Sequence, residues 1–205
     1  MTDSTSNGVS PRIKLVAVFS VFAVPFIIAT VWFNQIKSTS GSVESKANGK
    51  LVAPARPLEA FEQAALEGAT VNSLADLKDQ WTLLYFNDGD CNEVCAKTLY
   101  DSRQVRISLG REMHRVKRLM VGDTPLTPEL RELHLQLQTS GADQSEQGLK
   151  AQVRGHVGAE IFDADPEQLY LIDPLGNLMM RFPSELPQKL FLKDLKVLLK
   201  ASRIG

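Results

Sequence analysis

The chain has 205 residues, of which 43% are hydrophobic and 23% charged, a composition typical of one globular domain with short appendages. Its formal net charge is -1 and its pI is near 6.3, with lysines and arginines scattered among acidic residues. Such a chain has no basic field of the kind that attracts nucleic acid, so we exclude nucleic acid as a partner.

The N-terminal part of the sequence predicts a membrane anchor. Residues 1–14 are polar, and residues 15–33 then run without a charge over a length that can span a bilayer. The alternative is a cleaved signal peptide, but the run is longer than the usual apolar region of such peptides and no Ala-x-Ala site closes it. We therefore expect an uncleaved single transmembrane helix after an N-terminal cytoplasmic tail. Basic residues on both sides leave the orientation open from charge alone.

A polar segment separates this anchor from the rest of the chain. Residues 34–50 contain few large apolar side chains and cannot bury enough surface to fold, so they are expected to form a flexible linker. Residues 51–205 are then the globular domain.

The only two cysteines of the chain follow its most apolar strand. Residues 81–87 predict a buried strand, and a short polar turn leads from it into a helix that carries Cys91 and Cys95. Side chains four residues apart on a helix share one face, so the two thiols could form a disulfide or share a soft metal ion. A disulfide over so short a loop adds little stability, which favours a reactive pair over a structural bridge. Amides at the helix start favour a thiolate, whereas the acidic residues of the turn oppose it.

Further elements follow in alternating order. They are a short helix at 73–78, a cysteine helix that ends near Leu109 before Gly110, a strand at 116–121, a helix capped by Thr127 whose apolar face includes Leu137, a polar insertion at 138–159, hairpin strands at 169–172 and 178–182, and a last helix at about 191–199. With the thiols at the end of the first strand, this order predicts an α/β fold of the thioredoxin-like type.

Two motifs in this arrangement resemble a known family. The chain combines an apolar anchor, a hydrophobic strand that opens with Trp81, Cys-x-x-x-Cys at a strand-to-helix turn, and the segment 170–176, Tyr-Leu-Ile-Asp-Pro-x-Gly. This combination is similar to the Sco/SenC proteins, copper-handling assembly factors of cytochrome c oxidase, over about residues 51–202. The resemblance implies a domain that faces the bacterial periplasm from the inner membrane. It also implies that the partner is the copper-site subunit of the oxidase or another assembly factor.

The sequence departs from the family at the copper site. Family members bind copper with the two cysteines and a histidine that lies eight residues before the Asp of the Ile-Asp-Pro segment, and here that position is Asp165. A carboxylate is a hard ligand that does not replace imidazole for Cu(I). Ala96 also stands where the family has a proline. The chain resembles a divergent member that lost the third ligand, and an Asp165→His variant is expected to hold Cu(I) more tightly.

The chain has three histidines that could replace the missing ligand. His114 and His134 lie in stretches rich in Arg, Glu and Gln, and we expect both to face solvent on helix surfaces. His156 is nearer in sequence to Asp165, yet a solvated loop histidine is the favoured interpretation. It is retained only as a minor candidate beside Cys91 and Cys95 for Cu(I).

Three functions remain open at this point. The first and favoured one is a membrane-anchored thiol-disulfide reductant for oxidase copper-site cysteines, in which Cys91 attacks and Cys95 resolves a mixed disulfide. The second is a Cu(I) chaperone with a two-thiolate site, completed by His156 or by the partner. The third is a binding module without catalysis that holds an oxidase assembly intermediate.

Overall fold

The computed structural model describes residues 11–39, 47–64 and 66–205. The chain divides into two compact units, 1–45 and 46–205. Each unit is described by itself.

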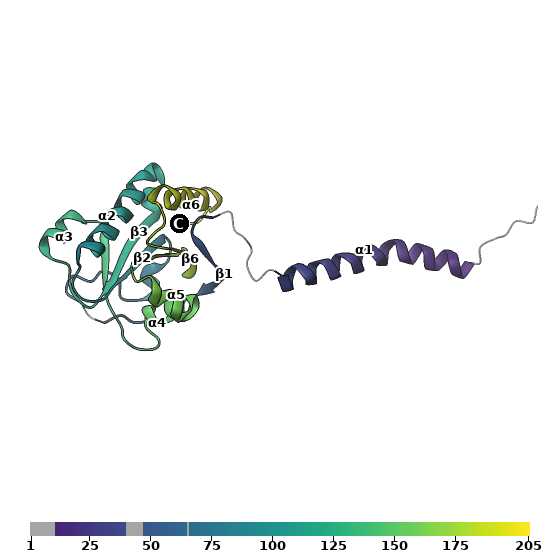
Figure 1. The fold of residues 1–205 in the computed structure, drawn as a ribbon, viewed down its shortest axis with the longest axis horizontal. Coiled ribbons are helices and arrows are strands. Elements are labelled where there is room, and N and C mark those ends of the chain that lie inside the picture. Colours follow the sequence, from purple (N-terminus) through teal and green to yellow (C-terminus); the bar gives the residue numbers. More distant parts are fainter. Residues whose placement is uncertain (1–10, 40–46, 65) are drawn as a thin grey trace, which may run out of the picture. The chain divides into compact units, whose positions relative to one another are not determined.

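Helix α1, Pro11–Thr39, forms the described part of the first unit (Figure 1). It contains the predicted anchor and extends past it at both ends, so residues 34–39 of the predicted linker are helical. Within the described ranges, no helix combines the length and the apolar character needed to cross a membrane. The transmembrane anchor is therefore not confirmed. Most of the predicted 1–14 tail and residues 40–46 of the predicted linker lie outside the described residues.

The second unit is built on one mixed sheet, which has six strands within the described residues. The strands are β1 Lys50–Pro57, β2 Trp81–Asn87, β3 Val116–Gly122, β4 Leu137–Gly141, β5 Leu169–Ile172 and β6 Asn177–Phe182. Their order across the sheet is β1-β6-β5-β2-β3-β4. Strands β2, β3 and β4 run parallel to one another, whereas β5 is antiparallel to both β2 and β6, and β1 is antiparallel to β6.

Helices cover both faces of this sheet. The helical elements of the domain are η1 Leu74–Leu77, α2 Glu93–Ser108, η2 Gly110–Arg115, α3 Pro128–Leu133, α4 Leu149–Val157, α5 Ala159–Ala164 and α6 Gln188–Ala201. Figure 1 shows α2 and α6 on one side of the sheet and α4 and α5 on the other. This is the α/β thioredoxin-like arrangement that the sequence predicted.

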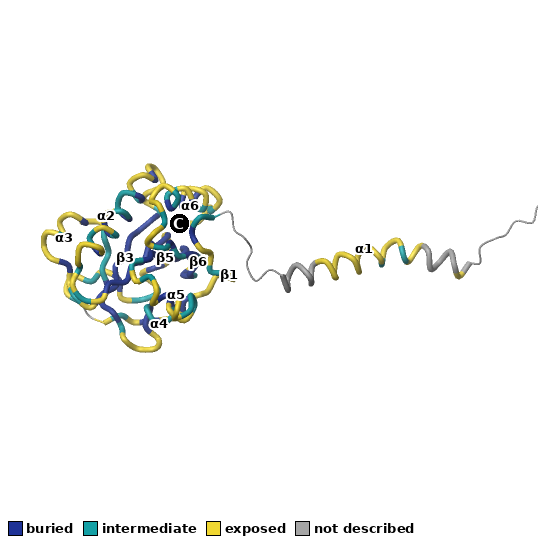
Figure 2. Tube along the Cα trace, in the orientation of Figure 1, coloured by how far each residue is buried: buried dark blue, intermediate teal, exposed yellow. Residues whose placement is uncertain are grey.

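The pattern of strand β2 explains why two layers of helices form. All of its residues are buried, as expected of a central strand covered on both faces (Figure 2). Leu83 and Tyr85 belong to the core cluster that contains the buried residues of α2 and α6. Leu84 and Phe86 alternate with them and belong to the second cluster, beneath α4 and α5. The two faces of β2 thus hold two separate cores.

Several local signals act as the sequence predicts. The Thr127 side chain accepts a hydrogen bond from the Leu130 amide, and Pro128 takes the first helical position of α3. Gly110 has φ of 61°, the left-handed conformation expected where α2 ends. In the hairpin turn, the Asp173 carboxylate accepts bonds from the backbone amides of residues 175 and 177.

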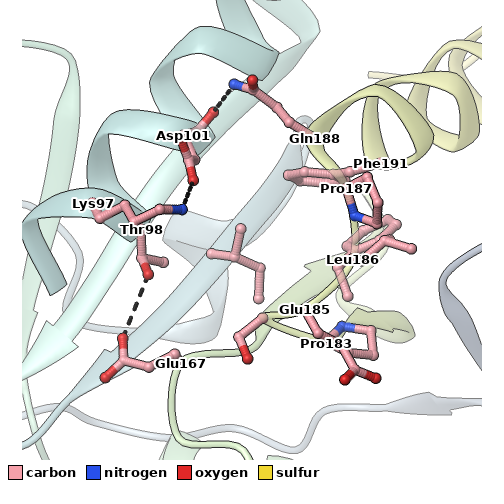
Figure 3. A pocket seen from close by; sticks show the side chains of 13 residues that line it. Lys97, Thr98, Asp101, Glu167, Pro183, Glu185, Leu186, Pro187, Gln188 and Phe191 are labelled. Carbon is pink, nitrogen blue, oxygen red and sulfur yellow. Dashed lines mark hydrogen bonds and ion pairs between the residues drawn. The ribbon is translucent and has the colours of Figure 1, made fainter. Parts of the chain in front are cut away.

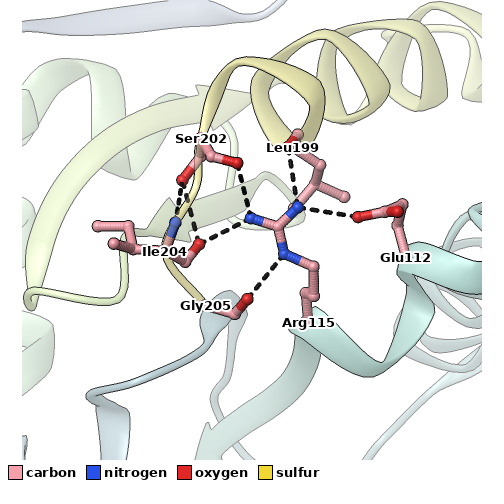
Figure 4. A network of polar contacts seen from close by, with 6 residues as sticks. All are labelled: Glu112, Arg115, Leu199, Ser202, Ile204 and Gly205. Carbon is pink, nitrogen blue, oxygen red and sulfur yellow. Dashed lines mark hydrogen bonds and ion pairs between the residues drawn. The ribbon is translucent and has the colours of Figure 1, made fainter.

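Two side chains hold α6 in place. The Arg115 guanidinium donates to the backbone carbonyls of residues 199, 202, 204 and 205 and to the Glu112 carboxylate, so it satisfies carbonyls at the end of the helix (Figure 4). Nearer the middle of the helix, the buried Asp194 carboxylate accepts 2.7 Å bonds from the Asn48 and Gly49 amides and the Asn48 side chain. These contacts fix the segment that leads into β1.

Candidate redox site

Cys91 and Cys95 form a disulfide, with their Cα atoms 5.2 Å apart. The pair lies after the C-terminal end of β2, which is the central strand of the sheet. Asn92 is the N-cap of α2, and its side-chain oxygen accepts 3.0 Å bonds from the amides of Val94 and Cys95. Because the helix begins at Glu93, Cys91 precedes it and only Cys95 belongs to its first turn.

The two sulfurs differ in access to solvent. Cys95 is 0% exposed and packs in the same core cluster as Leu99 and Tyr85. Cys91 is partly exposed at the rim of that cluster. A thiol or disulfide of another molecule can therefore approach Cys91 but not Cys95 without displacing part of the core.

The turn between β2 and α2 is held by side chains from other parts of the sheet. The Gly89 amide donates a 2.7 Å bond to the Asp123 carboxylate, which lies just beyond β3. Asp88 forms an ion pair with Lys150 of α4, with N to O distances of 2.5 and 2.6 Å. This pair partly neutralises the carboxylate charge that would otherwise oppose a thiolate at the neighbouring Cys91.

The loop before β5 also reaches the cysteine helix. The Glu167 carboxylate accepts a 2.5 Å bond from the Tyr85 hydroxyl and a 3.4 Å bond from Thr98, which lies on α2 one turn after Cys95. Burial and the Glu167 carboxylate together raise the pKa of Tyr85. Glu167 thus lies between the strand that leads to the disulfide and the helix that carries it.

A hollow of about 380 Å³ opens beside this contact (Figure 3). It lies between α2 and the segment that joins β6 to α6, and Thr98, Glu167 and Phe191 are among the residues that line it. Gln188 donates to the carbonyl of Asp101 across its far end.

Asp165 lies two residues before Glu167 in the same loop, but its carboxylate bonds to a different part of the domain. Its carboxylate accepts a 2.9 Å bond from the Ser184 amide, in the segment after β6. The position that aligns with the family's copper ligand is therefore bonded to the backbone of another loop, while Glu167 contacts α2.

The structure does not bring the predicted histidine to the cysteines. His156 lies on α4, whose buried residues Leu149 and Val153 pack in the second core, on the other face of the sheet from Cys91 and Cys95. Within the described ranges, no group of three or more His, Cys, Asp or Glu side chains is arranged to hold a metal ion. The residues present do not fit a copper site with two thiolates and an imidazole.

The other two histidines differ from each other. His114 is exposed in η2, as predicted. The prediction for His134 was wrong, because this residue is 2% exposed and follows directly on α3. Burial, together with the charges of Arg118 and Arg103, lowers the pKa of His134 to about 4. A buried imidazole beside two guanidinium groups stays neutral near pH 7.

Sequence reasoning found the two cysteines and missed their surroundings. Nothing in the sequence pattern marked Glu167, because it stands in a polar loop with no periodicity. Tyr85 was placed only as part of a buried strand. Its place within the apolar run Leu-Leu-Tyr-Phe of a buried strand was the available signal, because a buried tyrosine hydroxyl usually needs a partner.

Comparison with known proteins places this geometry in a family. The family model described as "Transmembrane-like, thioredoxin-like, C-terminal domain" matches residues 81–202, which is more than half of the chain. No curated protein matches the chain in sequence.

Solved structures with a similar fold include Sco proteins from several organisms. Yeast Sco1 with copper bound is 15% identical, with a TM-score of 0.52, and the match covers 71% of this chain and 94% of that one. Arabidopsis thaliana ScoI with copper bound is 15% identical, with a TM-score of 0.50 and coverage of 73% and 100%. A SCO1/SenC family lipoprotein from Bacillus anthracis is 16% identical, with a TM-score of 0.50 and coverage of 71% and 98%.

At this level of identity the structural likeness establishes the fold, and it confirms the resemblance to Sco/SenC proteins that the motifs indicated. The chain belongs to the family of transmembrane-like, thioredoxin-like C-terminal domains, and its fold is shared with the Sco proteins.

Proposed function

We propose that this protein is a thiol-disulfide oxidoreductase that acts as a reductant of cysteine pairs on a partner protein. The observation that carries the proposal is the disulfide between the partly exposed Cys91 and the fully buried Cys95 at the start of α2. This difference in access assigns separate roles to the two sulfurs, since only one of them can meet a partner.

The reaction starts from the reduced protein. The Cys91 thiolate attacks one sulfur of the partner's disulfide, a mixed disulfide forms, and the partner's other sulfur leaves as a thiolate. The Cys95 thiolate then attacks Cys91, the mixed disulfide breaks, and the partner's second thiolate leaves. The partner gains two electrons, and the Cys91–Cys95 disulfide of the structure is the oxidised product. A dithiol donor must reduce this product before the next turnover.

The substrate class that we propose is the cysteine pair of a cytochrome c oxidase copper site. Two likenesses support this choice: the solved Sco structures share the fold, and the Cys-x-x-x-Cys segment is one of the features in which the sequence resembles the Sco/SenC family. Copper carriage by this chain is less well supported, since Asp165 bonds to the Ser184 amide and His156 lies on the other face of the sheet. A binding module without catalysis gives no reason for the unequal exposure of the two sulfurs.

The test of this function is direct electron transfer to the proposed substrate. The reduced full-length protein is mixed anaerobically with an oxidised oxidase copper-site domain, and the partner's free thiols are counted by mass spectrometry after alkylation. We expect two new thiols for each disulfide formed in the wild type, and none with Cys91→Ala. A Ser108→Ala variant, changed at the far end of α2, serves as the control. Failure of the wild type to reduce this domain while it reduces a small disulfide would change the substrate and keep the chemistry.

The location that we propose is the bacterial periplasm, with attachment to the inner membrane through residues 15–33. The uncharged run and the disulfide support it, because disulfides persist in oxidising compartments. A Ser42→Cys variant should react with a membrane-impermeant maleimide in intact spheroplasts. Labelling that requires lysis would place the domain on the cytoplasmic side.

A further inference from the structure

A second hollow, of about 390 Å³, lies away from the disulfide. It is formed by the C-terminal half of α2, η2, β3, the end of α3 and the segment between α3 and β4. None of its lining residues lines the hollow beside Glu167. Three arginines face it: Arg103 and Arg106 from α2, and Arg118 from β3. Its volume is in the range of small-molecule sites.

Arg118 is a buried cation without an acidic partner. It is 2% exposed, and its Nη1 donates to the Leu99 carbonyl at 3.0 Å and to the Ser102 hydroxyl at 3.4 Å. Its Nε is buried and has no hydrogen-bond partner among the described residues. An unpaired buried charge is costly, which makes this group receptive to an anion.

Arg103 and Arg106 of α2 add to the positive charge of Arg118, and neither brings an acidic partner. Burial and the nearby charges of Arg106 and Arg103 together lower the pKa of Arg118 to about 10. Arg106 donates to the Val116 carbonyl and to Gln136, both neutral groups. Arg103 makes no hydrogen bond or ion pair that the structure describes. The three guanidinium groups of the hollow therefore repel one another, and an anion between them would relieve that repulsion.

Acidic groups do not already fill this role. Glu132 is the acidic residue that lines the hollow, and it is exposed. The ion pairs within the described ranges involve other residues, and none joins Glu132 to an arginine. His134 is buried and its pKa is lowered, so it is neutral at pH 7 and adds no charge to those of the arginines.

The remaining wall of the hollow is apolar. Ile107, Met113, Leu133 and Leu135 line it, and each of them is exposed, Leu135 by 84%. Exposed apolar side chains that gather beside charged ones mark a surface that can bind a ligand with both characters.

We propose that this hollow binds an amphipathic anion, a small molecule with a carboxylate or phosphate head and an apolar chain. The head takes the place of the missing counter-ion between Arg118, Arg103 and Arg106, where guanidinium forks can hold two oxygens at once. The chain covers Ile107 and Leu135. This site is separate from the redox chemistry of the cysteines, and neither depends on the other.

The test uses isothermal titration of the full-length protein with decanoate and with decyl phosphate. Decyltrimethylammonium, which has the chain with a positive head, and acetate, which has the head without the chain, are the comparison ligands. We expect saturable binding of one or both decyl anions, with the tighter one identifying the head group. The proposal is overturned if the decyl cation binds as tightly as the decyl anions, or if no decyl anion binds.

Three variants locate the binding. Arg103→Gln removes a charge that has no described partner and should weaken the decyl anion roughly tenfold, the effect of one charge-assisted hydrogen bond. Leu135→Ser shortens the exposed apolar wall without touching the charges and should weaken it severalfold. Lys196→Gln removes one positive charge from an exposed position of α6 and should have no effect. Wild-type affinity in both Arg103→Gln and Leu135→Ser would place the ligand elsewhere and overturn the proposal.

Discussion

The Tyr85 hydroxyl donates a 2.5 Å hydrogen bond to the Glu167 carboxylate, and this contact joins β2 to the loop that leads into β5. Because Glu167 also accepts a bond from Thr98, the same carboxylate is held against α2. It places a negative charge against Thr98, which lies three residues after Cys95 on the same helix. Such a charge disfavours a thiolate and therefore favours the protonated thiol in the reduced protein.

Replacement of Glu167 by glutamine should lower the pKa of the reactive thiol. The amide oxygen can still accept from Tyr85, while the negative charge is lost. We expect the pH midpoint for alkylation of the reduced protein by iodoacetamide to fall by about half to one unit. Glu185→Gln is the matched control, since Glu185 lines the same hollow but is exposed. A midpoint that stays or rises in Glu167→Gln would contradict the role given to this carboxylate.

The two cysteine variants should trap partners unequally. With Cys95→Ala, the exposed Cys91 can form a mixed disulfide that no second thiol resolves, so the adduct should accumulate. With Cys91→Ala, the remaining thiol is buried and should trap at least severalfold less. Non-reducing electrophoresis followed by mass spectrometry measures both adducts. Equal trapping by the two variants would mean that Cys95 becomes exposed in the reduced protein.

Histidine substitutions at positions 165 and 167, in the loop before β5, should differ in their effect on copper affinity. The sequence placed the third ligand at Asp165, but that carboxylate bonds to the Ser184 amide, whereas Glu167 contacts α2. We therefore expect Glu167→His to tighten Cu(I) binding by the reduced protein and Asp165→His to leave it nearly unchanged. An anaerobic competition with a chromophoric chelator measures the affinities. The reverse order would restore Asp165 as the ligand position.

His134 should make the domain less stable in acid. Its pKa is lowered to about 4 by burial and by Arg118 and Arg103, whereas an unfolded histidine titrates near 6.5. The unfolded chain thus binds the proton first, so stability is present above pH 6.5 and is lost as the pH falls toward 4. From pH 7 to 4.5, His134→Leu should lose roughly 2 kcal/mol less free energy of unfolding than the wild type.

Urea unfolding at the two pH values measures this difference. His114→Leu is the control, because His114 is exposed and should leave the slope with pH unchanged. Parallel losses in the wild type and His134→Leu would show that other groups cause the acid sensitivity.

Loss of the Arg115 guanidinium should destabilise the domain through α6. Its bonds to carbonyls at the end of that helix are partly buried, and glutamine can replace few of them. We expect Arg115→Gln to lower the free energy of unfolding by about 2 kcal/mol. Urea titration beside Arg111→Gln, an exposed arginine of the same short helix, measures the effect. An equal loss in both variants would assign it to net charge.

The sequence predicted the elements whose apolar pattern is strong and missed those that depend on neighbours. Strands β2, β3, β5 and β6 carry runs of large apolar residues, and α2 and α6 have clear starts or faces. Strand β4 has the polar residues Gln138, Thr139 and Ser140 at its centre, so the sequence predicts a polar insertion there and wrongly places Leu137 on the helix before it. It is a strand because its backbone pairs with β3 on one side and bonds to Thr70 and Val71 on the other.

The same limit applies to the site. The spacing of Cys91 and Cys95 is local, so the sequence could predict their disulfide as one alternative. The contacts of Glu167 with Tyr85 and Thr98 span 82 and 69 residues, and they exist only because β5 pairs with β2. The prediction for His134 failed for a related reason. Its neighbours along the chain are polar, and they do not show that the folded domain buries this side chain.

If the domain is attached to a membrane as we propose, the Asp194 carboxylate has a mechanical consequence. It holds Asn48 and Gly49, the residues that lie directly before β1, through three hydrogen bonds to one side chain of α6. A pull on the chain upstream would therefore load these bonds among the first, ahead of the pairing between β1 and β6. Tension would reach the edge of the sheet and the last helix before it reached β2, so the cysteines at the centre would be shielded from a pull on the chain that precedes the domain.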